Sequence, residues 1–156
     1  MTVSEDYFIK WNPEINYREN PHLYKTGKGQ QGVLICEPYK SEICKHWRFK
    51  TVLEAKVSSS TILAMFYDYL KVDDFVGADM AKKFLHMGFT RSRRYANHKS
   101  GVKYNRKGEI LPIERDCMTS EKAQCAAIFY EKWKIARTNE KYLSLKKRHK
   151  LIENKR

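Results

Sequence analysis

Apolar residues follow no regular spacing in the first fifty positions. Turn signals recur there at Asn12–Pro13, Asn20–Pro21, Gly27, Gly29 and Gly32, and such residues interrupt regular structure. Gly32–Cys36 is a short apolar run bounded by glycine and by Glu37–Pro38, and it is predicted to be a strand. A second extended piece is predicted at His46–Phe49. This part of the chain is therefore expected to be irregular, with a small β component.

After Thr51 the apolar positions take up helical spacing. From Val52 to Leu70 they predict a helix that is interrupted at Ser58–Ser60 and ends near Lys71. Asp73 or Asp74 can cap the next helix, whose apolar stripe runs from Val76 to Met87. Gly88 is predicted to stop that helix, and Thr90 to cap a separate basic turn that carries Arg91–Asn97.

The C-terminal third is predicted to hold long helices. Residues 99–112 are expected to form a loop or a small hairpin around Lys107–Gly108, after which Thr119 or Ser120 can cap an amphipathic helix. Thr138 can cap a last helix that runs towards Asn154. The fold class predicted is mainly α with a small β component (α+β), in one compact domain over residues 1–156. Its parts are an irregular, β-containing region 1–50, a helical basic region 51–99 and C-terminal helices over 119–154.

Length and composition support a folded domain. The chain has 156 residues, 42% of them hydrophobic, with 10 Tyr, 7 Phe and 3 Trp, which is too apolar for a disordered chain. No stretch approaches the roughly 18 apolar positions that a membrane span needs. Glu5 and Asp6 do not fit the basic and then apolar layout of a signal peptide. A cytoplasmic protein without a membrane partner is expected.

Positive charge is concentrated in two segments. The chain has 31 Lys and Arg against 18 Asp and Glu, a net charge of +13. Between Met80 and Gly108 there is no acidic residue, whereas nine are basic: Lys82, Lys83, Arg91, Arg93, Arg94, Lys99, Lys103, Arg106 and Lys107. The segment after Glu131 is also basic, with Glu140 and Glu153 as its acidic residues. This acid-free run is expected to form an outward-facing cationic patch. Such concentration of charge favours a polyanionic partner, although a solvated surface with a basic tail remains an alternative.

Nucleic acid is the partner that this charge pattern predicts, with DNA favoured over RNA. Phosphate binding is assigned to Arg91, Arg93, Arg94, Lys99 and Lys103, helped by Lys28, Arg48 and Lys50. Tyr95 is a candidate for stacking on a base and Asn97 for reaching a base edge. A helix-turn-helix is a weaker match, because Ala81 and Gly88 are seven positions apart, where that motif puts its alanine about four positions before its glycine.

Gly27-Lys28-Gly29-Gln30-Gln31-Gly32 has the G-x-G-x-x-G form of a dinucleotide-binding loop. That loop needs a strand before it and a helix after it. Here the predicted strand follows instead, so a dinucleotide site is not expected. Two alternatives remain open, namely a loop that grips a phosphate through backbone N–H groups and Lys28, and a plain turn.

No cofactor or metal is expected. The four cysteines form two pairs, Cys36 with Cys44 and Cys117 with Cys125, each eight positions apart. Zinc sites need ligands two to four positions apart, and eight helical residues separate two side chains by about 12 Å. Buried reduced thiols are the expected state of these residues.

Two other functions stay open. In the first, the protein is an enzyme acting on a phosphodiester or nucleotide, with His98 or His46 as acid or base, because imidazole titrates near neutral pH. In the second, it is an inhibitor that binds an acidic host protein through the Lys-rich C-terminal helix. His86 is a further histidine candidate, and none of the three has a carboxylate partner visible in the sequence.

Several strings of this chain resemble one uncharacterised family, catalogued as domain of unknown function 4385 and seen in tailed phages, bacteria, fungi and algae. They are Arg18–Pro21, Gly27–Leu34, Glu37–Ile43, His46–Lys50, Asp74–Gly77, Met87–Arg91, Arg93–Lys99 and the region Ala126–Trp133. Family members resemble one another in carrying proline at the place of Lys45 and glycine at that of Ser100, so the local turns differ here. The resemblance implies a small cytoplasmic protein, in the host cytoplasm if phage-encoded, and brings no established activity, cofactor or site.

Overall fold

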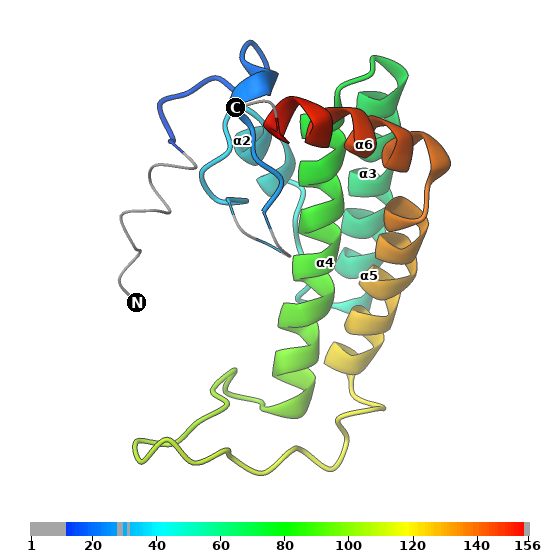
Figure 1. Cartoon of the computed structure of the whole chain (residues 1–156). Helices are drawn as coiled ribbons and strands as arrows, with labels where there is room; N and C mark the ends of the chain where they lie inside the picture. Colours follow the sequence, from blue (N-terminus) through cyan, green and yellow to red (C-terminus); the bar gives the residue numbers. More distant parts are fainter. Residues whose placement is uncertain (1–11, 28–29, 31, 155–156) are drawn as a thin grey trace.

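The regular structure of the described residues is helical. The computed structural model describes residues 12–27, 30 and 32–154. In chain order its elements are the 3-10 helix η1 (Pro21–Leu23) and the α-helices α2 (Tyr39–Cys44), α3 (Val52–Lys71), α4 (Phe75–Asn97), α5 (Glu121–Arg137) and α6 (Glu140–Asn154). Helices α3, α4 and α5 lie side by side as a bundle, and α6 crosses the bundle at one end (Figure 1).

Local capping signals fix where the helices begin. Asp74 Oδ1 accepts a hydrogen bond from Gly77 N at 3.0 Å, and Ser120 Oγ accepts one from Ala123 N at 3.2 Å, so the predicted caps Asp74 and Ser120 are confirmed. The predicted cap Thr138 is wrong by one position. Asn139 Oδ1 caps α6 by accepting from Tyr142 N at 2.9 Å, whereas the Thr138 hydroxyl donates back to Lys134 O at the end of α5.

Helix α3 has the predicted bounds but no interruption, and helix α4 is longer than expected. Ser58 and Ser59 are buried within a continuous α3, where the Ser59 hydroxyl donates to Lys56 O. Gly88 does not stop α4 but lies in the middle of it. A Cβ at Gly88 would lie 2.3 Å from Phe129 Cδ1, so this glycine allows α5 to approach closely. The helix-turn-helix reading is therefore wrong, because one helix spans all of its parts.

The predicted β component is absent from the described residues, which form no sheet. Residues after Gly32 form a helical turn instead of a strand, with Gly32 O accepting from both Ile35 N and Cys36 N. The pattern of buried side chains explains why this segment is not a strand. Val33 and Cys36, three positions apart, are buried, while Leu34 is 53% exposed; this is helical spacing and not the alternation of a strand.

Two further segments lack the extended pairing that a strand needs. His46–Phe49 begins in a turn in which Trp47 N donates to Cys44 O. Its rings pack against the bundle, with the ring centroids of Trp47 and Phe84 5.6 Å apart. In the loop between α4 and α5, an isolated bridge joins Tyr104 to Ile110 around a turn closed by Gly108 at φ +80°. The expected loop or small hairpin is therefore a loop that contains one turn and one isolated bridge.

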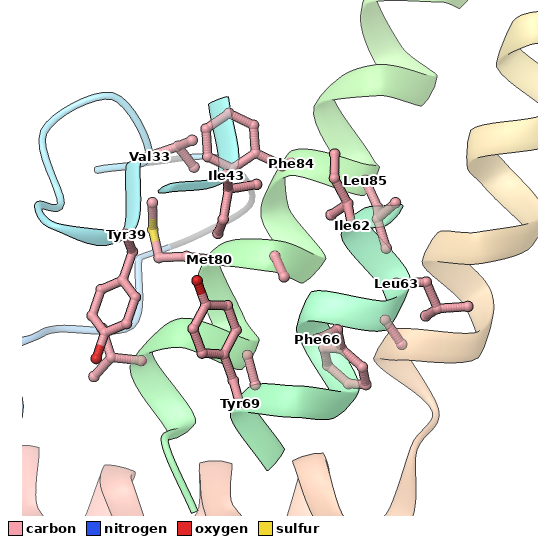
Figure 2. Close-up of a cluster of buried hydrophobic side chains, with 14 of the residues drawn as sticks. Val33, Tyr39, Ile43, Ile62, Leu63, Phe66, Tyr69, Met80, Phe84 and Leu85 are labelled. Atoms are coloured by element: carbon pink, nitrogen blue, oxygen red, sulfur yellow. The ribbon is translucent and has the colours of Figure 1, made fainter. Parts of the chain in front are cut away.

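The apolar core is formed by α3, α4, α5 and α6 together with the described residues before α3, called here the N-terminal segment. Figure 2 shows Ile62, Leu63, Phe66 and Tyr69 of α3 with Met80, Phe84 and Leu85 of α4, and Val33, Tyr39 and Ile43 from the segment before them. Ile43 belongs to α2, a short helix that the sequence pattern did not predict. Burial of such side chains removes apolar surface from water and supplies most of the stabilisation of the bundle.

A charged residue lies inside this core. Asp79 of α4 is 1% exposed and accepts hydrogen bonds from the hydroxyls of Tyr24 and Tyr142, the latter at 2.6 Å. Lys83 Nζ lies 3.5 Å from Asp79 Oδ2, and Lys82 Nζ lies 3.6 Å from Oδ1. Since Tyr24 comes from the N-terminal segment and Tyr142 from α6, one carboxylate joins three parts of the fold.

His149 of α6 extends this contact towards the N-terminal segment. Its Nε2 lies 2.6 Å from Tyr24 O and 3.5 Å from Glu153 Oε1. Glu153 in turn accepts from the hydroxyl of Thr26 at 3.0 Å.

Every helix in the described ranges is too short or too polar to span a bilayer.

Candidate nucleic-acid interface

The C-terminal half of α4 and the first part of the loop after it, up to residue 108, carry seven basic side chains, called here the α4 basic surface. They are Arg91, Arg93, Arg94, Lys99, Lys103, Arg106 and Lys107. Within the described ranges, none of the seven lies within ion-pair distance of a carboxylate. Figure 1 shows this end of α4 and the loop after it at the end of the bundle opposite α6. The charge therefore faces outward, as the sequence predicted for this part of the acid-free run.

The first two basic residues of the same run behave differently. Lys82 and Lys83 pair with Asp79, and Lys83 is only 2% exposed. Asp79 lies one position before the acid-free run. A count of charges within the run therefore omits the carboxylate that neutralises these two lysines. The expectation that the whole run forms an outward patch is wrong for these two lysines.

A hollow of about 280 Å³ lies within the α4 basic surface and is called here the α4 hollow. Its lining consists of Phe89, Thr90, Arg93, Arg94, Asn97, His98 and Lys103. Five of these, namely Arg93, Arg94, Asn97, His98 and Lys103, were singled out from the sequence. The structure thus brings together two of the three predicted phosphate-binding arginines of α4, one of the histidine candidates and a lysine from the loop.

Arg93 links two parts of the chain beside the α4 hollow, the end of α4 and the loop between α4 and α5. Its guanidinium donates to Asn97 Oδ1 at 3.2 Å, one turn further along α4, and to Cys117 O in the returning loop. The loop is also attached to the end of α4 by Glu114 N, which donates to Asn97 O at 2.8 Å. Arg93 is therefore a positioned cation that fixes one wall, whereas Arg94, which is exposed, has no such anchor within the described residues.

His98 forms part of the lining and is 7% exposed. Its Nδ1 is buried and has no hydrogen-bond partner among the described residues. A buried N–H without an acceptor is costly, which favours the tautomer that carries the proton on Nε2. In that tautomer Nε2 is a hydrogen-bond donor, so His98 adds a donor and no negative charge to the hollow.

The opposite flank of α4 holds a second group of the predicted residues. The guanidinium of Arg91 lies 5.2 Å from the centroid of the Trp47 ring. Tyr95 is 40% exposed, and the ammonium of Lys122 lies 5.7 Å from its ring. Lys122 also donates to the carbonyl of Lys50 at 3.2 Å. Segment 47–50 is thus fastened beside α4, with Lys50 exposed at its edge.

The glycine-rich loop reaches the edge of the hollow through one side chain. Gln30 Nε2 donates to the Thr90 hydroxyl at 2.8 Å and lies 3.5 Å from His86 Nδ1. Lys28, the residue predicted to grip a phosphate, lies outside the described residues. Of this loop, the structure places Gln30 beside the α4 hollow.

Arg48 and His46 are separated from the α4 hollow. Both line another hollow, against the start of α3, together with Glu54. His46 and His98 thus lie at different sites, and no acid–base pair of these two histidines is assembled. His86 is stacked on Trp133 with ring centroids 4.5 Å apart, and burial lowers its pKa below 6.5, helped by Lys82 and Arg137.

Carboxylates distinguish the α4 hollow from three other hollows on the molecule. Asp73 and Asp74 line the hollow at the start of α4, Glu54 lines the one on α3, and Glu114 lines the one in the loop. The α4 hollow has three cations in its lining and no carboxylate. Of these four hollows, it is electrostatically the best suited to an anion.

Some residues of the site were missed from the sequence. Phe89 and Thr90 line the hollow, and they lie three or four positions before Arg93 and Arg94, which is the spacing of one helical face. Recognising that α4 continues through Gly88 would have found both. Lys122 gave no comparable signal, because its contact with segment 47–50 joins parts of the chain far apart in sequence.

Metal and thiol chemistry have no assembled site in the part of the chain that the structure describes. No group of three His, Cys, Asp or Glu side chains is placed to hold a metal ion there. All four cysteines are free, and burial raises the pKa of both Cys36 and Cys125 above the ordinary thiol value. Thiolate formation at these two positions is therefore disfavoured.

Comparison with known proteins gives a family and no activity. No curated protein and no solved structure matches the chain. A family described as a domain of unknown function, DUF4385, matches residues 6–151, which include all of the helices up to the last turns of α6. The chain therefore belongs to the DUF4385 family.

Proposed function

We propose that the protein is a nucleic-acid-binding accessory protein that contacts phosphates through the α4 basic surface. The observation that carries this proposal is the absence, within the described ranges, of carboxylate partners for the seven cations of that surface. Unpaired positive charge repels itself and does not stabilise a fold, whereas it attracts a polyanion. DNA is the favoured partner over RNA, and a cytoplasmic location, in the host cytoplasm if phage-encoded, is part of the same proposal.

The end of α4 presents one opposing effect, since the C-terminus of a helix carries about half a negative charge. Here two of the last four carbonyls of α4 are occupied, because Arg94 O accepts from His98 N and Asn97 O from Glu114 N, both at 2.8 Å. The remaining repulsion is of the order of 0.3–1 kcal/mol. A single cation–phosphate pair about 4 Å apart near a surface gains about 4 kcal/mol before desolvation. Three cations in the hollow outweigh the helix end.

The arrangement of the surface favours binding over catalysis. Arg91 and Tyr95 lie on one flank of α4, and Arg93 and Asn97 on the other. Three of the seven cations line the α4 hollow, and the other four lie outside it along α4 and the loop. Backbone contact needs only such a spread of charge. The enzyme alternative has His98 or His46 as its acid or base. The two line separate hollows, and only His98 lies within the α4 basic surface.

The test is a fluorescence anisotropy titration with a labelled DNA duplex and the same sequence as a single strand, at low salt. A triple variant, Arg91→Gln, Arg94→Gln and Lys99→Gln, should weaken binding at least about tenfold, because it removes three phosphate contacts. The matched control is Lys56→Gln, Lys71→Gln and Lys150→Gln, which makes the same charge change at exposed positions of α3 and α6. Equal weakening by both variants would show a diffuse charge effect and would refute this site.

A further inference from the structure

We infer that the α4 hollow binds the terminal phosphate of a nucleic-acid strand, a phosphomonoester, while the rest of the α4 basic surface contacts internal phosphates. This inference rests on the proposed function and names its ligand more closely. The lining of the hollow is positively charged. Arg93, Arg94 and Lys103 are cations, and no carboxylate lies beside them in the hollow.

The charge of a phosphomonoester fits this lining better than that of a phosphodiester. A monoester carries about −1.5 to −2 at neutral pH and has three strong acceptor oxygens, whereas an internal diester carries a single negative charge. The planar guanidinium of Arg94 can donate two parallel hydrogen bonds to two of those oxygens. Arg93 donates through Nε and Nη2 to Asn97 and Cys117, which leaves its Nη1 for the ligand. Three converging cations are more than one diester needs, and they match a dianion.

The size of the hollow is compatible with a single phosphate group. At about 280 Å³ it is just below the range of ordinary ligand pockets, which is about 300–1,000 Å³. The loop that carries Glu114 and Cys117 is hydrogen-bonded to Asn97 and Arg93 beside it. A terminal phosphate has the strand on one side only, so cations can approach more of its oxygens than those of an internal phosphate.

Neutral donors complete the site. Asn97 Oδ1 is occupied by Arg93, so its amide nitrogen is left to donate to a ligand. His98 is more than nine-tenths buried, and its Nδ1 has no partner within the described residues, which leaves Nε2–H as the ring donor. Phe89 forms the edge of the hollow, with its ring centroid 5.0 Å from that of Tyr130. It offers a surface on which the terminal nucleoside can stack.

The experiment compares single-stranded oligonucleotides of about 12 nucleotides, within the range of a compact binding site. Each carries an internal fluorophore and has a 5′-phosphate, a 3′-phosphate or hydroxyl groups at both ends. An oligonucleotide one nucleotide longer with hydroxyl ends controls for the added charge. Anisotropy at low salt should show one phosphorylated form binding about tenfold more tightly than the hydroxyl form, and the longer control binding within about twofold of it.

Two variants locate the effect. Arg94→Gln, at an exposed position in the lining, should reduce the preference for the phosphorylated end to below about threefold. Arg106→Gln makes the same charge change in the loop, outside the lining, and should weaken all oligonucleotides while keeping the preference. Equal binding of phosphorylated and hydroxyl ends by the unmodified protein overturns the inference and leaves the proposed function intact. Failure of every oligonucleotide and of duplex DNA to bind overturns both.

Discussion

The buried carboxylate of Asp79 gives the most direct prediction about stability. Substituting Asp79→Asn keeps the shape of the side chain but removes its charge, which leaves Lys83, 2% exposed, and Lys82 without the carboxylate that they face at 3.5 and 3.6 Å. Breaking a buried pair by removing one partner costs about 3–5 kcal/mol. Because whole domains are stable by only about 5–15 kcal/mol, this single change should remove a large part of the stability.

Urea denaturation followed by circular dichroism measures the change. The control is Asp68→Asn, whose carboxylate is 72% exposed and lies 3.8 Å from Lys71; it should change the free energy of unfolding by less than about 1 kcal/mol. Adding Lys83→Met to Asp79→Asn should recover part of the loss, because a buried charge is then removed. A loss below about 1 kcal/mol for Asp79→Asn would refute the assignment of this carboxylate as the charged centre of the core.

The pH dependence of this effect has a definite sign. Burial by itself would raise the pKa of Asp79, but Lys83, Lys82 and the hydroxyls of Tyr142 and Tyr24 outweigh it and hold the pKa below 3.8. A carboxyl group with a depressed pKa stabilises the fold fully above its unfolded value and loses that contribution as the pH falls through the folded value. The difference between the unmodified protein and Asp79→Asn should thus be full at pH 7 and shrink below pH 3.8.

Two further changes test the packing of α4. Gly88→Ala should destabilise the protein by about 1–3 kcal/mol, in spite of alanine's higher helix propensity, because its Cβ would lie 2.3 Å from Phe129 Cδ1; unchanged or higher stability in thermal unfolding would contradict this close approach. Arg93→Gln should speed hydrogen exchange in residues 113–118, because it removes the bond to Cys117 O, and unchanged protection there would show that the loop is held in another way.

Sequence reasoning succeeded where the signal is local. Asp74 and Ser120 cap helices through their own side chains and a backbone N–H three positions later, so the residue type and the following apolar pattern suffice to find them. The outward charge of Arg91, Arg94 and Lys99 was predicted for a similar reason, since no acid lies near them in the chain. The end of α3 near Lys71 is likewise marked by the polar stretch that follows it.

Sequence reasoning failed where contacts between distant residues decide the structure. Gly88 reads as a helix stop, but Phe129 from α5 packs against it and the helix continues. Gly32–Cys36 reads as a strand by composition, yet Val33 and Cys36 pack into the helical core. The burial of Lys83 depends on Tyr24 and Tyr142 holding Asp79, and these lie 55 and 63 positions from it. No local pattern encodes such a contact.

The salt dependence of DNA binding tests the central claim most directly. If about six phosphates are neutralised by the α4 basic surface, the logarithm of the association constant should fall against the logarithm of salt concentration with a slope of about −5. The triple variant Arg91→Gln, Arg94→Gln and Lys99→Gln removes about three phosphate contacts, each worth about 0.9 in slope, so the slope should become about −3. A slope near zero, or no binding at low salt, would contradict the account.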